Sequence, residues 1–200
     1  MKAIDTRDTR RRLDALIEEL GRRPRPVRIV RKGACWHQRA AGACLKAVTL
    51  GGQRTYLTQY VTTLGCTIYV PDDFDNWPPT RAWQVLRHEL VHVAQFERYG
   101  WTLMVLLYGV LPLPIGLSYF RARLEWEAYV ETLRAVAESE GMEAARSPAL
   151  REEIVRRFTG PDYAWMWPFP GAVRRWIAGA LDQIEREIAG SDALFRPQRI

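Results

Sequence analysis

The sequence of 200 residues is poor in cysteine. Its three cysteines, Cys35, Cys44 and Cys66, are odd in number and show no C-x-x-C spacing. This argues against a disulfide framework and against a separate zinc knuckle. The N-terminus is too charged for a secretory signal, and no internal repeat or low-complexity segment is present. We therefore expect a reducing, cytoplasmic setting.

Lysine is also scarce, because 26 of the 29 basic residues are arginine. The net charge of +6 is unevenly spread: residues 1–60 carry 14 Lys/Arg against 5 Asp/Glu, giving +9, and the remainder carries 15 against 18, giving −3. A basic segment can bind nucleic acid, anionic lipid or an acidic partner, but it is more often a solvated face. We expect no specific nucleic-acid binding. A binding module that recruits nucleic acid or anionic membrane through this basic third is the alternative function.

The composition, 48% hydrophobic and 26% charged, is typical of a globular protein. We expect a basic N-terminal helix and linker at 1–25 and a single domain at 26–200. Apolar periodicity and breaker residues predict helices at 6–20, 80–100, 118–138, 141–146, 148–158 and 172–189, a strand at 27–30, and a hairpin formed by 55–62 and 66–70. The predicted fold class is α+β, with a small sheet followed by a mostly helical half.

Charge is missing altogether from Trp101 to Phe120. Twenty uncharged residues are long enough to cross a membrane, but glycines and prolines interrupt the second half of the stretch. We expect a buried helical hairpin that packs against the preceding helix, and a membrane-facing element is the less favoured alternative. Residues 160–170 are rich in aromatics and proline. They are expected to cap the core, with the Tyr163 hydroxyl as a candidate oxyanion stabiliser.

Histidine is the third scarce residue, and two of the three histidines stand in His88-Glu89-Leu90-Val91-His92. On a helix the i, i+4 spacing places both imidazoles on one face, where they can ligate a single metal ion. Glu89 lies about 100° around the helix and can hold a metal-bound water without being a ligand. The simpler interpretation is two histidines on an ordinary buried helix. His37 and Cys35 are minor alternative ligands.

The H-E-x-x-H pattern resembles that of zinc peptidases. The metzincin extension needs glycine and histidine where this chain has Gln95 and Arg98. The two histidines are followed 33 residues later by Glu125-Trp126-Glu127-Ala128-Tyr129, which is similar to the gluzincin arrangement of the prenyl-protease and heat-shock membrane-protease group and of many small bacterial zincin-like domains. The resemblance covers roughly residues 55–138.

This resemblance implies that His88, His92 and Glu125 bind Zn²⁺ and that Glu89 is the general base of a zinc-dependent peptidase, whose partner is a peptide or protein substrate. Tyr129 stands where the family usually has an aspartate that supports a ligand histidine. Another hydrogen-bond acceptor is then needed to fix the tautomer of that histidine. Because the chain lacks a clear set of membrane spans, the substrates of the membrane proteases do not carry over.

The choice between Glu125 and Glu127 as third ligand depends on the helix that they share. Two residues correspond to about 200° of rotation, so the two carboxylates point to opposite sides. The side of Glu127 carries alternating charges typical of a solvated face, namely Arg123, Glu131, Arg134 and Glu138. Apart from Arg121 at the helix start, Glu125 is the only charge on its own side, and a carboxylate buried on an apolar face is costly unless a cation or metal compensates it. The other residues of that side are Ala122, Ala128, Tyr129, Thr132 and Val136. The sequence therefore favours Glu125.

Overall fold

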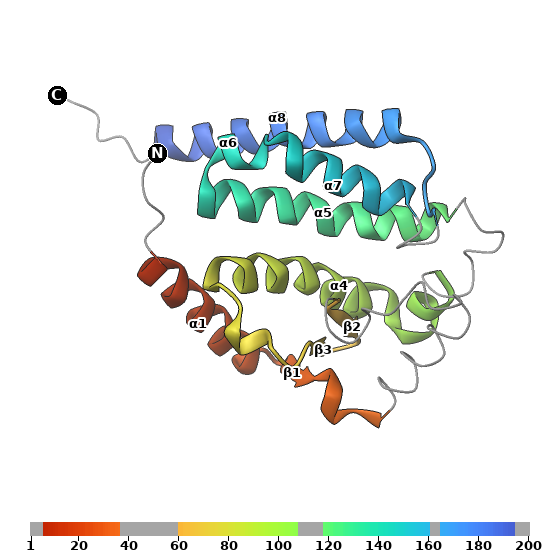
Figure 1. Cartoon of the computed structure of the whole chain (residues 1–200). Helices are drawn as coiled ribbons and strands as arrows, with labels where there is room; N and C mark the ends of the chain where they lie inside the picture. Colours follow the sequence, from red (N-terminus) through yellow and green to blue (C-terminus); the bar gives the residue numbers. More distant parts are fainter. Residues whose placement is uncertain (1–5, 37–59, 108–117, 161–164, 195–200) are drawn as a thin grey trace. The chain divides into compact units, whose positions relative to one another are not determined.

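The computed structural model describes residues 6–36, 60–107, 118–160 and 165–194. The chain divides into two compact units, residues 1–109 and 110–200, coloured red to green and green to blue in Figure 1. Of the described residues 76% are helical, and these residues include one small three-stranded sheet, which agrees with the general α+β class. Tyr163, His37 and Cys44 lie outside the described residues. The division expected at residue 25 stays a prediction.

The first unit contains the sheet and two long helices. Its elements are α1 (Thr6–Arg22), β1 (Arg28–Arg31), η1 (Lys32–Ala34), β2 (Thr62–Leu64), β3 (Thr67–Val70), η2 (Phe74–Asn76) and α4 (Pro79–Val105). The strand order is β1-β3-β2, with β1 parallel and β2 antiparallel to β3. Gly65 takes the positive φ of 60° that the tight β2–β3 turn requires, and the antiparallel pairing confirms a hairpin around Leu64-Gly65. Its first strand runs from Thr62 to Leu64, whereas the predicted strand ended at residue 62. The part of that prediction at 55–59 lies outside the described residues.

Helix α4 carries the H-E-x-x-H sequence. It begins at Pro79, whose fixed φ suits the first helical turn. From the sequence, Thr80 after Pro78-Pro79 is the expected N-cap of this helix. That prediction is wrong, because Pro78 occupies the cap position and no side chain caps the helix. Gly100 has non-helical φ and ψ of 75° and 164°, so the helix breaks there as predicted, but a second helical segment continues to Val105. The inner face of α4 packs along β2.

The described start of the uncharged stretch differs from the expected buried hairpin. After the break at Gly100 the side chains of Trp101, Leu103 and Val105 are exposed, and only Met104 is buried. Trp101 folds back on Phe96, with ring centroids 5.4 Å apart. Residues 108–117 of the predicted hairpin lie outside the described residues. None of the helices in the described part of the chain combines the length and the apolar character needed to cross a lipid bilayer.

The basic N-terminal third is partly neutralised by its own fold. Helix α1 packs against α4 through its apolar side, with Leu13 and Leu20 buried. Its arginines and those of the following residues form ion pairs with carboxylates, namely Arg12–Asp8, Arg22–Glu18, Arg23–Glu97 and Arg31–Asp75. Exposed pairs of this kind contribute little to stability, but they reduce the positive charge that is open to a polyanion. The absence of specific nucleic-acid binding stays a prediction.

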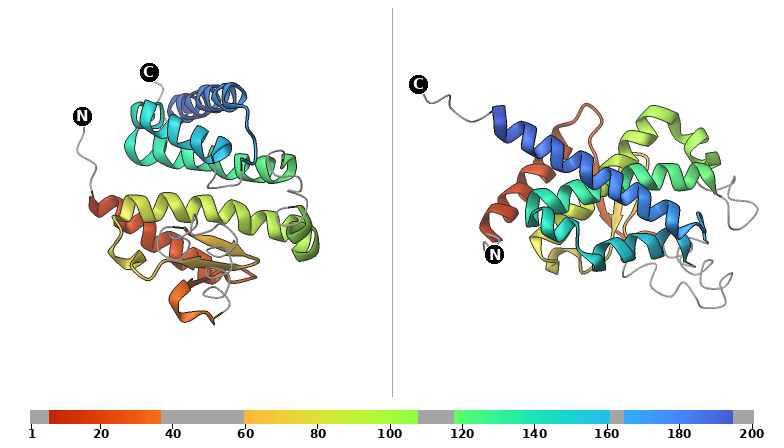
Figure 2. Two further views of the ribbon diagram at one scale, coloured as in Figure 1. Left: turned by 45° about the vertical axis from the view of Figure 1, so that its right-hand side comes forward. Right: turned by 90° about the horizontal axis from the view of Figure 1, so that it is seen from above.

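The second unit is helical. Its elements are α5 (Tyr119–Glu140), α6 (Met142–Ala145), α7 (Pro148–Thr159) and α8 (Pro170–Leu194). Figure 2 shows α8 running along α5 and α7, and both pairs are in contact. Ser147 caps α7 by accepting a hydrogen bond from the backbone N of Leu150 at 3.4 Å. The four helices of this unit enclose one apolar core.

Phe158 lies at the centre of this core. It is fully buried and its ring contacts those of Trp126, Tyr129 and Trp176, with centroids 5.5 to 6.3 Å apart. In the described part of the aromatic segment before α8, Met166 joins the core, whereas Trp165 and Phe169 are exposed. The predicted core-capping role therefore holds for only part of that segment.

We expect Phe158→Ala to lower the free energy of unfolding by about 3–5 kcal/mol, because the change opens a cavity among aromatic rings that cannot close in on it. The measurement is denaturant unfolding followed by circular dichroism. Phe169→Ala is the matched control, since Phe169 is 47% exposed, and it should cost less than about 1 kcal/mol. Equal losses for the two variants would show that Phe158 is not the centre of the core.

Candidate metal centre

The two histidines of α4 lie one helical turn apart on one face, as the sequence predicts. Their ring centroids are 5.1 Å apart and their planes are inclined by 74°. His92 is buried and His88 is partly buried. Buried imidazoles on a common face can present their ring nitrogens to one ion.

Gln95 fixes the orientation of His92. The amide oxygen Oε1 of Gln95 lies 2.9 Å from Nδ1 of His92, and both side chains are buried. An amide oxygen only accepts hydrogen bonds, so it pairs with the tautomer of His92 that carries its proton on Nδ1, and that tautomer leaves the lone pair of Nε2 for a metal ion. In the family that the sequence resembles, an aspartate at the position of Tyr129 accepts a hydrogen bond from a ligand histidine. Gln95 is the corresponding acceptor for His92 in this chain. The i, i+3 spacing from His92 was the sequence signal for it.

A residue of the sheet holds the side chain of Glu89 in place. Its carboxylate is buried, and Oε2 accepts a hydrogen bond of 2.7 Å from the hydroxyl of Thr63 on β2. A hydroxyl that donates to one oxygen restricts rotation of the carboxylate about its terminal bond. Sequence reasoning did not find Thr63, because 26 residues separate it from Glu89 and no local pattern connects them.

A buried lysine lies near the same carboxylate. Lys32, the first residue of η1, has no solvent exposure, and its Nζ donates a hydrogen bond of 2.8 Å to Oγ1 of Thr62. Burial lowers the pKa of Lys32 to about 8, and the negative charge of Glu89 partly opposes this shift. Lys32 is therefore still mostly protonated near neutral pH. Sequence reasoning did not find it either.

The burial of Glu125 and Glu127 on α5 agrees with the helix faces on which the sequence places them. Glu125 is 1% exposed and shares its side with the buried Ala122 and Ala128. Glu127 is only partly buried and pairs with Arg123 at 3.7 Å, on the side where Arg134 also pairs with Glu131. The burial of a carboxylate among small apolar side chains is costly unless a cation compensates it.

His88, His92 and Glu125 form a group that could hold a metal ion. No second group of this kind occurs among the described residues. Two imidazoles and one carboxylate are ligands that suit a borderline divalent ion. Glu89 is not a member of the group. Cys35, the alternative ligand that the structure describes, is a free cysteine outside it.

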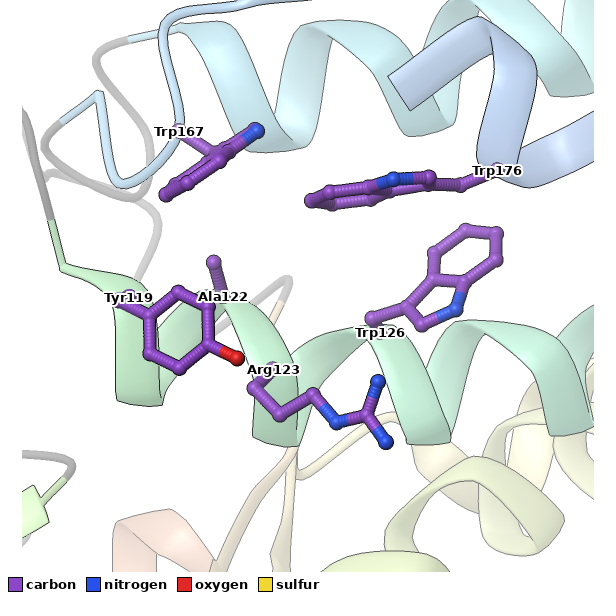
Figure 3. A pocket seen from close by; sticks show the side chains of 6 residues that line it. All are labelled: Tyr119, Ala122, Arg123, Trp126, Trp167 and Trp176. Atoms are coloured by element: carbon purple, nitrogen blue, oxygen red, sulfur yellow. The ribbon is translucent and has the colours of Figure 1, made fainter. Parts of the chain in front are cut away.

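The second unit also contains an aromatic pocket. Figure 3 shows its walls, formed by Tyr119, Ala122, Arg123, Trp126, Trp167 and Trp176, around a cavity of about 180 Å³. The indoles of Trp167 and Trp176 stack there with centroids 5.7 Å apart. Arg123 is its one charged wall residue, and no residue of the metal group or of its hydrogen-bond partners lines it. This pocket therefore contains none of the residues that the sequence predicts to be catalytic or to bind the metal.

Comparison of the chain with protein-family models, with curated proteins and with solved structures finds no match.

Proposed function

We propose that this protein is a zinc-dependent peptidase in which His88, His92 and Glu125 hold the ion and Glu89 is the general base. The donor set supports zinc, because two histidines and a glutamate are a set that leaves a coordination position open for water or substrate. A zinc ion bound there would supply Lewis-acid polarisation of a carbonyl and would lower the pKa of water.

The general base is the residue whose environment supports this proposal best. Glu89 follows a candidate ligand directly in sequence, is buried, and is held by Thr63 without belonging to the ligand group. Since Oε2 accepts the Thr63 hydrogen bond, we assign proton transfer to Oε1, which would take the proton of the attacking water and deliver it to the leaving amine. A structural metal site has no use for such a base.

The sheet supports a peptide as the substrate. Strand β2 carries Thr63 and pairs with β3 on one side, and no further strand pairs with it in the described parts of the chain. An extended peptide that added itself to this edge would lie beside the strand that holds the general base. Main-chain hydrogen bonds to β2 would then orient the scissile bond with little dependence on the substrate's side chains.

The proposal is tested on purified protein by elemental analysis and a peptide-library cleavage assay. We expect about one zinc ion per chain, cleavage that stops after dialysis against a chelator, and recovery of cleavage on adding back zinc. The His88→Ala/His92→Ala double variant is the control for a contaminating protease. Cleavage that survives in this variant, or a wild-type protein that binds no divalent metal, would exclude the proposal.

A further inference from the structure

The aromatic pocket of the second unit is too large to be a packing defect. Its cavity has a volume of about 180 Å³, whereas voids in a packed core rarely exceed one water molecule. An apolar cavity of about 150 Å³ is already large enough to bind benzene. The small side chain of Ala122 leaves this space open on α5, and Figure 3 shows its methyl group between Tyr119 and the indoles. The cavity therefore has room for one aromatic ring with a small substituent.

The walls of the cavity present aromatic faces. Trp167 and Trp176 stack with their planes inclined by 30°, and Trp126 is inclined to Trp176 by 52° with the centroids 5.6 Å apart. The ring of Tyr119 lies across from them, 6.1 Å from Trp167. The three indoles pack against the apolar core and are only partly buried, so the core does not use their whole surface. A flat apolar group can stack on these faces.

The polar groups of the pocket lie on its α5 side. Figure 3 shows the Tyr119 hydroxyl and the Arg123 guanidinium there, opposite the two stacked indoles. The Arg123 side chain is 63% exposed, and its Nε lies 3.7 Å from Oε1 of Glu127. A charge-assisted hydrogen bond spans about 2.7–2.9 Å, so this pair leaves guanidinium donors for a second anion. The pocket thus combines an apolar interior with a cationic rim.

We propose that this pocket binds a small aromatic carboxylate, whose ring lies against the indoles and whose carboxylate pairs with Arg123. The planar guanidinium matches a carboxylate in geometry and charge. Aromatic rings can also enclose a quaternary ammonium ion, but Arg123 is the only charged residue among the described residues that line the pocket, and it repels a cation. The inference does not depend on the proposed peptidase activity, because neither the metal group nor Glu89 lines the pocket.

The first test compares four probes on the full chain by ligand-observed NMR titration. Phenylacetate should bind with a Kd of about 1 mM or below, the range expected for a ligand of this size. Phenylacetamide keeps the ring without the charge and should bind more weakly. Acetate lacks the ring and benzyltrimethylammonium has the opposite charge, so neither should bind measurably. The absence of phenylacetate binding, or tighter binding of acetate or of the ammonium probe, would overturn the proposal.

The second test locates the carboxylate. Arg123→Gln should weaken phenylacetate binding at least about tenfold, the loss expected when hydrogen bonds to a charged group are removed, and should leave phenylacetamide binding within about twofold. The fold should persist, because Arg123 lies at the exposed rim. Arg175→Gln is the matched control, since Arg175 is an exposed arginine next to Trp176 that does not line the pocket. Unchanged phenylacetate binding in Arg123→Gln, or an equal loss in both variants, would count against the assigned site.

The third test locates the ring. Ala122→Val places additional carbon atoms in the space that the ring would occupy, so it should weaken phenylacetate and phenylacetamide alike, by at least about tenfold. Circular dichroism checks that this variant is folded. If it is not, the comparison of Arg123→Gln with Arg175→Gln still decides the proposal. A folded Ala122→Val variant that binds both probes as the wild type does would show that the ring lies outside this cavity.

Discussion

Replacing Glu89 with glutamine should leave about one zinc ion bound per chain and lower kcat for peptide hydrolysis by at least about a hundredfold, the loss typical of removing a general base. Glutamine has the shape of glutamate and its carbonyl oxygen can still accept the hydrogen bond from Thr63. The fold and the metal group should therefore persist. The change removes only the basicity of the carboxylate, so the effect should appear in kcat with KM little altered.

The matched control is Glu97→Gln. Glu97 lies on the same helix, about 12 Å further along its axis, and forms a surface ion pair with Arg23 at 3.0 Å. The same chemical change there should affect neither zinc content nor hydrolysis. Wild-type activity in Glu89→Gln would remove Glu89 from the mechanism. Loss of zinc from that variant would instead make Glu89 a ligand.

Replacing Glu125 with glutamine should weaken zinc binding by at least about a hundredfold. Changes to residues that merely support a ligand already cost 10- to about 100-fold in metal affinity, and removal of a ligand should cost no less. An amide is a poorer ligand for zinc than a carboxylate, and the carboxylate charge that offsets the ion is lost as well. The measurement is a competition titration of zinc with a chromophoric chelator. Hydrolysis at limiting zinc should fall in parallel.

Glu127→Gln is the control for this experiment, because the two residues are of one type, on one helix and two positions apart. Glu127 is partly exposed and pairs with Arg123, so its loss should leave zinc affinity unchanged and cost well under 1 kcal/mol of stability, or about the worth of one surface pair. If Glu127→Gln released zinc and Glu125→Gln did not, the two faces of α5 would have been assigned the wrong way round.

Helix periodicity predicted much of the local structure. It placed the helices of both units within a few residues of their observed bounds, and it placed Glu125 on the buried side of α5. These features depend on contacts between residues three or four positions apart, so a single stretch of sequence contains the information.

The errors arise where helical pattern and tertiary environment conflict. Thr80 is a good capping residue, but Pro79 already begins the helix and Thr80 falls inside its first turn. The run after Gly100 is apolar enough to suggest burial, yet Trp101 and Leu103 are exposed. Apolar composition indicates that a segment favours an apolar environment, but it does not specify whether the folded chain provides one.

By itself, the sequence determined which residues could carry the chemistry. The i, i+4 spacing of His88 and His92 puts both imidazoles on one face of any helix, and Gln95 follows at the spacing that lets it reach His92. Only the tertiary structure decided what surrounds Glu89. Thr63 is 26 residues away from it in sequence, and the two side chains meet because α4 packs along β2. Contacts between residues so far apart depend on how strands pair and how a helix packs on them, and no local pattern encodes either.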